Sequence, residues 1–197
     1  MKKSSYIGLA IIIVIFAVIV VPKIFDRLTN NATVDSSRSI KPGFKALDFI
    51  KINGEPKKVP EFLFLNQDSI YVSNEDYLGK VYVAEFFFTT CPSICPIMNK
   101  NMKILNDAFG DQENFGIASF TIDPDNDTPS VLKKYAESYV GKEVSWNFLT
   151  GPKSSVYDLA NKGFNIFAKI NPAVAGGFEH QGYFALIDKK GFIRSRQ

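Results

Sequence analysis

The strongest constraint on the fold is an apolar run that leads directly into a cysteine pair and then into a helical pattern. Residues 81–88 are almost continuously apolar and rich in β-branched and aromatic side chains, which is typical of a buried central strand. The phrase Cys-Pro-Ser-Ile-Cys-Pro follows at 91–96, and residues 96–109 repeat apolar side chains with a helical period. Because proline is tolerated in the first turn of a helix, we expect Cys95 at or near a helix N-terminus.

Strand and helix patterns continue to alternate along the chain. Strands are predicted at 115–122 and 146–149, helices at 129–139 and 154–162, and a closing hairpin at 183–187 and 192–195. Such alternation predicts an α/β fold with a central mixed sheet flanked by helices. With two cysteines at a strand-to-helix junction, a thioredoxin-like architecture fits best.

Cys91 and Cys95 are the only cysteines, so they must be explained together. Residues four apart at the start of a helix lie on the same side, close enough for two sulfurs to bond each other or to share a soft metal ion. The helix N-terminus favours a thiolate, so a lowered thiol pKa is expected. Two inert buried cysteines are the alternative, but the flanking prolines favour a redox or metal site.

The N-terminus predicts a membrane anchor. An apolar run at 6–21 lies between Lys2 and Lys3 on one side and Lys23 on the other. We therefore expect one transmembrane helix within residues 1–25 that crosses the cytoplasmic (inner) membrane once, with the rest of the chain on the outer, periplasmic side. A cleaved signal peptide is the alternative, although no small-x-small cleavage site follows the run.

Composition divides the remaining chain into two parts and removes one class of partner. Residues 26–40 are polar and predict a linker, and residues 41–197 are one domain in length. With 23 Lys and Arg against 20 Asp and Glu, the net charge of +3 gives no electrostatic footprint for nucleic acid. The predicted location also affects the cysteines. An oxidising compartment would convert the cysteine pair to a disulfide unless the pair were kept reduced or loaded with metal.

His180 is the only histidine and lies just before the predicted hairpin. In a thioredoxin-like fold the loop that enters this hairpin faces the cysteine turn. A lone histidine is often an ordinary surface or core residue. Near two thiolates, however, an imidazole completes a two-sulfur, one-nitrogen site suited to copper.

Four segments in this order resemble the SCO/SenC family of copper-binding proteins. They are the cysteine phrase at 91–96, the segment Thr-Ile-Asp-Pro-Asp-Asn-Asp-Thr-Pro at 121–129, His180, and Ala-Leu-Ile-Asp-Lys-Lys-Gly at 185–191. The resemblance runs from about residue 60 to the end of the sequence. It implies a membrane-anchored, thioredoxin-like domain that binds copper, as Cu(I) or Cu(II), through Cys91, Cys95 and His180.

The same resemblance implies a function in assembling the copper centre of cytochrome c oxidase, with the copper-bearing subunit as partner. Other copper carriers or thiol reductants are further expected partners. Family members usually continue into a final helix, so residues 41–197 are expected to lack that helix. Many members also have an acidic residue between the cysteines, where this chain has Ser93.

Two functions therefore stay open. One is a copper chaperone, and the other is an extracytoplasmic thiol-disulfide oxidoreductase in which Cys91 attacks a partner's disulfide and Cys95 resolves it. Enzymatic activity is thus an open question, and a peroxidase is the weakest reading. The single histidine favours the chaperone, because a pure reductase does not need a soft-metal ligand there.

Other candidates are weaker. Asp123, Asp125 and Asp127 imitate the opening of a calcium-binding loop, but the required glycine and final glutamate are missing, so a strand-to-helix connection is expected. Met98 and Met102 have the spacing of core residues.

Two expectations concern the surroundings of the thiols. Glu85 interrupts the apolar strand and could tune proton transfer at the thiols or face solvent. The stretch 170–182, rich in glycine and without periodicity, predicts a long flexible connection that closes over the thiols when copper binds.

Overall fold

The computed structural model describes residues 16, 21, 47–140 and 145–196. The chain divides into two units, Met1–Ala46 and Leu47–Gln197. The predicted anchor (1–25) and linker (26–40) lie outside the described residues except for positions 16 and 21. Among the residues that are described, no helix is both long and apolar enough to cross a membrane.

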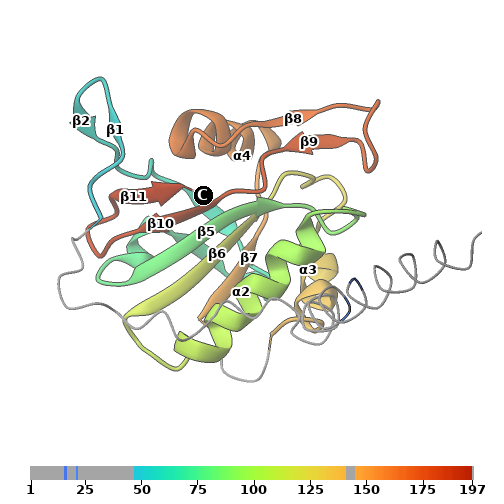
Figure 1. Ribbon diagram of the computed structural model, residues 1–197, viewed down its shortest axis with the longest axis horizontal. Helices are drawn as coiled ribbons and strands as arrows, with labels where there is room; N and C mark the ends of the chain where they lie inside the picture. The colour runs from blue at the N-terminus through green and yellow to red at the C-terminus, as the bar shows by residue number, and fades with distance from the viewer. Residues whose placement is uncertain (1–15, 17–20, 22–46, 141–144, 197) are drawn as a thin grey trace, which may run out of the picture. The chain divides into compact units, whose positions relative to one another are not determined.

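The second unit is built on a five-stranded mixed sheet (Figure 1). Its strands, in spatial order, are β11 (Ile193–Arg196), β10 (Phe184–Ile187), β5 (Val81–Phe87), β6 (Phe115–Thr121) and β7 (Trp146–Leu149). Strands β5, β6 and β7 are parallel, whereas β10 runs antiparallel to both β5 and β11. The expected strands, the mixed sheet and the closing hairpin are therefore confirmed.

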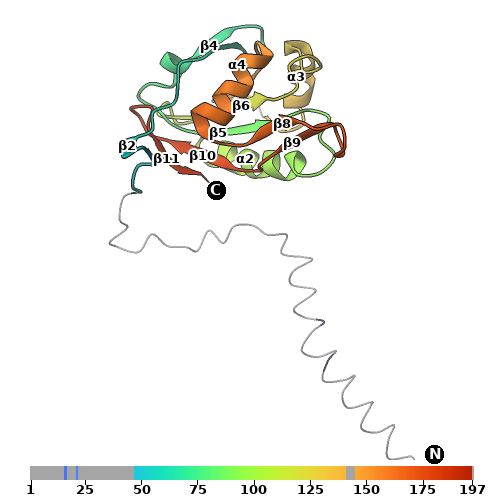
Figure 2. The same ribbon diagram turned by 90° about the horizontal axis from the view of Figure 1, so that it is seen from above.

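Helices cover both faces of the sheet. Helices α2 (Cys95–Phe109) and α3 (Pro129–Ala136) share one face, where the side chains of Asn99 and Tyr135 are hydrogen-bonded at 3.0 Å. Helix α4 (Lys153–Asp158) continues into the π-helical segment η2 (Leu159–Phe164), and Figure 2 shows α4 and α2 on opposite sides of the sheet. This layered arrangement is thioredoxin-like, as expected.

Aromatic side chains of β5 fill the core on both faces of the sheet. Phe86 faces η2 and packs on Phe120 and Phe164, with ring centroids 5.3 and 5.5 Å away. Its neighbour Phe87 faces the other way and stacks on Tyr135 at 5.4 Å. Because successive side chains of a strand alternate between faces, β5 is buried on both sides and needs the continuous apolar run seen in the sequence.

The turn of the closing hairpin is set by Asp188. Its carboxylate accepts hydrogen bonds from the backbone N–H groups of Lys190 and Phe192, both at 3.0 Å. Gly191 takes a positive φ of 82°, a conformation that glycine adopts without steric cost. The turn therefore brings β11 beside β10, and β10, which follows the segment that carries His180, pairs on its other edge with β5.

Several short elements were not expected from the sequence. They are β1 (Lys51–Ile52), β2 (Glu55–Pro56), β3 (Leu63–Leu65), β4 (Tyr71–Ser73), the 3-10 turn η1 (Asn74–Tyr77), β8 (Ala168–Ile170) and β9 (Phe178–His180). Strands β8 and β9 pair with each other, so the expectation that 170–182 has no regular structure was wrong for the strand residues; residues 171–177 form the connection between the two strands. Each of these strands has at most three residues, which is too short to show a hydrophobic period.

Candidate metal centre

The first cysteine lies in a tight turn at the end of β5. The backbone N–H of Cys91 donates to the carbonyl of Phe88 at 3.2 Å. Thr89, the residue after Phe88, donates two hydrogen bonds to the carboxylate of Asp127. Its backbone N–H lies 3.0 Å and its hydroxyl 2.5 Å from the carboxylate oxygens. Asp127 is fully buried and also accepts a bond from the hydroxyl of Thr121, so it ties the cysteine turn to the end of β6.

The second cysteine is the first residue of helix α2, as the sequence predicted. Pro96 occupies the first turn, where its missing N–H leaves no intrahelical bond unmade. The side chain of Asn99 donates to the carbonyl of Cys95 at 3.0 Å. The helix start is thereby fixed, and the Cys95 thiol is held under the turn with no exposed surface.

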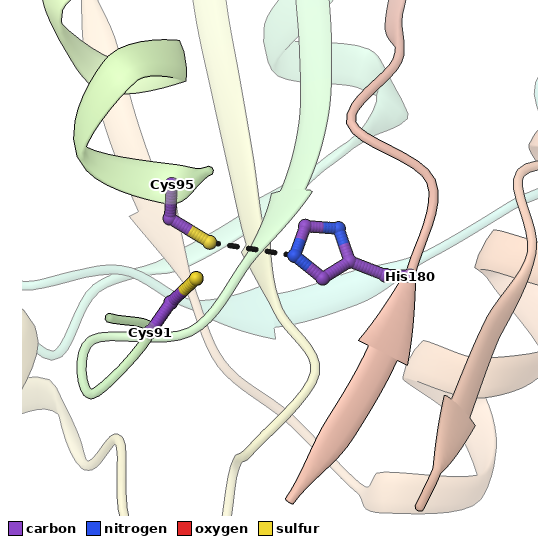
Figure 3. A group of neighbouring side chains, drawn as sticks. All are labelled: Cys91, Cys95 and His180. Atoms are coloured by element: carbon purple, nitrogen blue, oxygen red, sulfur yellow. Dashed lines mark hydrogen bonds between the residues drawn. The ribbon is translucent and has the colours of Figure 1, made fainter. Parts of the chain in front are cut away.

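The imidazole of His180 completes the group from the opposite side (Figure 3). His180 is the last residue of β9, and its Nε2 lies 3.4 Å from Sγ of Cys95. Its Nδ1 lies 3.3 Å from the carbonyl oxygen of Gln181. The possible ligand atoms of Cys91, Cys95 and His180 all lie within 4.8 Å of one another. The three residues predicted as ligands are therefore together.

A shallow pocket of about 230 Å³ gives access to this group. Most of its wall is apolar, and Glu179 is the charged residue in the lining; the walls include Phe88, Ser93, Ile94, Val174, Phe178 and Glu179. Cys91 is 7% exposed and Cys95 is fully buried, so a partner reaches Cys91 first.

The two thiols differ in acidity. Burial opposes ionisation of Cys91, but hydrogen bonds from Cys95 and Ser93 outweigh that effect and lower the pKa of the Cys91 thiol. Burial raises the pKa of Cys95, and the hydrogen bond with Cys91 raises it further. The expected lowering of the thiol pKa at the helix N-terminus was therefore wrong for Cys95, because desolvation outweighs the helix dipole there. Cys91 is therefore the more acidic thiol of the pair.

His180 is kept in the form that binds metals. Burial lowers the pKa of its imidazole, and the hydrogen bond with the carbonyl of Gln181 opposes that shift only in part. A neutral imidazole has a free lone pair on one nitrogen, and the partner of the other nitrogen fixes which one. Since Nδ1 faces a carbonyl oxygen and acts as the donor there, Nε2 presents its lone pair to the thiols.

Glu85 is buried, so the alternative of a solvent-facing residue at a strand edge was wrong. It lies on the central strand β5, where Ser119 donates a 2.6 Å hydrogen bond to its Oε1, and Trp146 donates to Ser119 at 2.8 Å. Burial raises the pKa of Glu85 to about 7. A charge on Glu85 also raises the pKa of Cys95, so the carboxyl and the thiol interact electrostatically.

The weaker candidates behave as the sequence suggested. Asp127 points into the protein, and Asp125 pairs with Lys153 at 2.5 Å on the surface, so the acidic segment is a strand-to-helix connection. Met98 and Met102 are buried.

Sequence reasoning missed the residues that hold the ligands. Asp127 supports the cysteine turn from 38 positions away. The ring of Phe88 lies edge-on to His180, with centroids 5.8 Å apart. No local pattern in the sequence could have revealed either contact, because each joins segments that meet only in the fold.

A buried thiol pair at the start of a helix, faced by one imidazole on a mixed sheet, defines a thioredoxin-like protein with a thiol and imidazole centre suited to soft metals or to redox chemistry. The family model described as SCO1/SenC matches residues 51–196. The chain therefore belongs to the SCO1/SenC family.

Individual relatives support the same family membership. The SCO1 protein homolog of Bacillus subtilis is 38% identical over 138 residues, which cover 69% of this chain and 71% of the relative. A solved structure of BsSco, described as a member of the Sco family of cytochrome c oxidase assembly proteins, superimposes with a TM-score of 0.64 at 33% identity, covering 77% of this chain and 87% of the other.

A copper-bound structure has the same fold. Bradyrhizobium japonicum ScoI with copper bound superimposes with a TM-score of 0.62 at 22% identity, covering 71% of this chain and 88% of the other.

Proposed function

We propose that this protein is a copper chaperone that binds one copper ion through Cys91, Cys95 and His180 and helps to assemble the copper centre of cytochrome c oxidase. The observation that carries this proposal is the meeting of two thiols and one imidazole within 4.8 Å. Family membership and the copper-bound structure of a neighbour support it.

The donor set suits both oxidation states of copper. Thiolates are soft ligands that favour Cu(I), whereas imidazole also suits the harder Cu(II). Binding requires deprotonated thiols, so copper capture releases the protons that Cys91 and Cys95 carry in the free protein. Cys95 is fully buried and His180 is half-buried, which limits the access of water and competing ligands to the ion.

Delivery then takes place by exchange of sulfur ligands. Cys91 is the thiol at the pocket and has the lower pKa, so it is the ligand that a partner's thiolate replaces first. The copper-bearing subunit of cytochrome c oxidase is the proposed acceptor, with other copper carriers as the proposed donors. The apolar wall of the pocket suits a partner segment that carries cysteines among uncharged residues.

Anaerobic titration of the reduced protein with Cu(I) and with Cu(II) tests this function. We expect about one copper per chain and loss of both reactive thiols from a free-thiol count once copper is bound. A protein that leaves both thiols reactive at equimolar copper is not a copper chaperone.

A second function, extracytoplasmic thiol-disulfide exchange, is favoured by the unequal acidity of the cysteines. The Cys91 thiolate would attack a partner's disulfide to form a mixed disulfide, and Cys95 would then displace the partner's second sulfur as a thiol. The partner gains two electrons, and Cys91 and Cys95 end as a disulfide that an external thiol reductant must reduce. Since a copper-bound pair cannot be a disulfide, the two functions alternate at one site.

We also propose that the domain is tethered to the cytoplasmic membrane and faces the periplasmic side. The support is the apolar run at 6–21 between lysines, which lies outside the described residues except for positions 16 and 21. Protease added to spheroplasts should digest the domain. Protection until the membrane is broken would reverse the proposed orientation.

A further inference from the structure

The third ligand is carried by a part of the fold that is not in the main sheet. Strands β8 and β9 form a separate two-stranded ribbon, and the five-stranded sheet does not include them. A lone two-stranded ribbon has little stability of its own in water. Other contacts must therefore hold His180 opposite the thiols.

One such contact comes from the side chain of Asn161 in η2. Its Oδ1 accepts a hydrogen bond from the backbone N–H of Ala168 at 3.1 Å, and its Nδ2 donates to the carbonyl of Ala168 at 3.0 Å. Nδ2 also donates to the carbonyl of Tyr157 at 3.0 Å, which ties the amide back to α4. A single side chain therefore binds both backbone groups of one residue and fixes that residue to the helix.

The residue so held is the cross-strand partner of His180. The register of the ribbon pairs Ala168 with His180. In an antiparallel pair, the N–H and C=O of one residue both point toward the partner strand or both point away. Because both groups of Ala168 bind Asn161, they point away from β9, and Asn161 acts as a one-residue substitute for a further strand. Ala168 is itself 4% exposed, so this edge is packed against the core.

Two further backbone hydrogen bonds join the two sides of the ribbon, one at each end of β8. Phe167 accepts a backbone hydrogen bond from Gln181 at 3.0 Å, and Asn171 donates one to Gly177 at 2.9 Å. Neither pair connects the ribbon to η2. Ile166, two residues before Ala168, donates to the carbonyl of Ala160 in η2 at 2.9 Å. Within the described strand β8 itself, the amide of Asn161 is the hydrogen-bonded link to η2.

The π-helical geometry of η2 places Asn161 at this edge. A π-turn holds an additional residue compared with an α-turn, which rotates the side chains that follow it, and such turns occur often at functional sites. On the opposite side, the ring of Phe88 lies edge-on to the imidazole at 5.8 Å. His180 is thus located between a hydrogen-bonded backbone support and an aromatic wall.

We propose that Asn161 is a positioning residue that holds His180 opposite the two thiols by binding the backbone of Ala168, the cross-strand partner of His180. This inference rests on the proposed copper function for its effect on copper, but the geometry it describes exists in the copper-free protein. Loss of the amide frees the outer edge of β8 and lets the ribbon, with the imidazole, move away from Cys95.

The test uses the fact that His180 is the only histidine, so its ring signals in NMR spectra are unambiguous. In the reduced, copper-free protein, Asn161→Ala should shift the His180 ring signals and weaken the nuclear Overhauser contacts to Phe88. In Cu(II) titrations the same variant should bind about 10-fold more weakly, the lower end of what loss of an outer support costs a metal site. Cu(I) affinity should fall less, because the two thiolates do not depend on the ribbon.

The matched control is Lys162→Ala, which alters the next residue of the same π-turn. Lys162 is exposed, and its ion pair with Asp158 lies on the surface, so both readouts should stay at wild-type values. Asn161→Asp keeps the side-chain volume and the acceptor for Ala168 but cannot donate to either carbonyl. It should show the same direction of change, and it takes the place of the alanine variant if that variant does not fold.

A double-mutant cycle separates positioning from general destabilisation. If Asn161 acts through His180, adding Asn161→Ala to His180→Ala should cause no further loss of Cu(II) affinity. Two results would overturn the inference. One is an equal loss of Cu(II) affinity on adding Asn161→Ala to the wild-type protein and to His180→Ala. The other is unchanged His180 ring signals together with unchanged Cu(II) affinity in both Asn161 variants. A wild-type protein that binds no copper would instead refute the proposed function, and the NMR comparison would still decide the role of Asn161.

Discussion

The two sides of the candidate site are built in different ways. The thiols come from one phrase of five residues between the central strand β5 and helix α2, both of which are packed in the core. The imidazole comes from a short ribbon, 85 residues further along the chain, whose strands pair only with each other. The thiol side is therefore held by the core, whereas the imidazole side depends on a few specific contacts.

This difference suggests separate functions for the two sides. A fixed thiol pair can retain Cu(I) or form a disulfide without the ribbon. The histidine on its separately supported ribbon would contribute mainly to holding Cu(II), for which imidazole is a suitable ligand. The expectation that residues 170–182 close over the thiols when copper binds stays a prediction.

The largest effect is expected on the thiol side. Cys91→Ser or Cys95→Ser should each lower the affinity for copper by more than about 100-fold, beyond what loss of an outer-shell partner costs, because no other residue can replace the lost thiolate. Anaerobic competition with a Cu(I) chelator measures this loss. Lys100→Ala, an exposed change on helix α2, is the control and should keep tight binding. Chelator-resistant, stoichiometric copper in the double Cys→Ser variant would contradict the thiol site.

Glu85 should make the stability of the thiol side depend on pH. Its pKa is about 7 in the folded protein and 4.5 as a free side chain, so folding favours the protonated form. The contribution of Glu85 to the free energy of unfolding is fully present below about pH 4.5 and is lost as the pH rises through 7. The free energy of unfolding therefore falls by up to about 3 kcal/mol over this range. Urea unfolding of the reduced, copper-free protein at several pH values measures it.

The matched variant is Glu85→Gln, which keeps an acceptor for Ser119 but does not titrate. His180, with a lowered pKa, and Asp123, with a raised one, titrate in both proteins, so the difference between the two stability profiles isolates Glu85. Parallel profiles would show that folding does not shift the pKa of the Glu85 carboxyl.

The sequence predicted the thiol side much better than the imidazole side. The run at 81–88 and the helical period at 96–109 are local signals, and both elements form where expected. His180 was predicted as a ligand from the fold and the family resemblance, but the ribbon that carries it was not. Its strands have three residues each; Asn161, seven positions away, binds the backbone of β8, and Phe88, which is distant in sequence, packs against β9. The raised pKa of Cys95 was also missed, because burial is a property of the fold and not of the motif.

A smaller and more selective effect is expected on the imidazole side. His180→Ala should weaken Cu(II) binding and alter its visible absorption, while the disulfide couple of Cys91 and Cys95 stays near its wild-type potential. Paired titrations with Cu(I) and Cu(II), at a pH where the wild-type imidazole is neutral, measure the selectivity. Lys169→Ala, an exposed change on the same ribbon, is the control. Equal Cu(II) affinity and unchanged absorption in His180→Ala would mean that the ring only packs against its surroundings and would favour the reductase.

The smallest effect concerns the tip of the ribbon, where two adjacent glycines form a natural pair of test sites. Gly176 and Gly177 have positive φ values of 87° and 80°, so alanine at either position costs about 1–2 kcal/mol of backbone strain. They differ in their surroundings, because a Cβ at Gly176 would lie 2.8 Å from the ring of Phe88, whereas one at Gly177 would have no described atom within 4 Å. Thermal unfolding should therefore show a loss of stability in both variants, and the loss should be larger in Gly176→Ala. Only Gly176→Ala should also shift the His180 ring signals, since it displaces Phe88 from the imidazole. Equal ring shifts in the two variants would show that the ribbon tip, and not its contact with the cysteine turn, sets the place of His180.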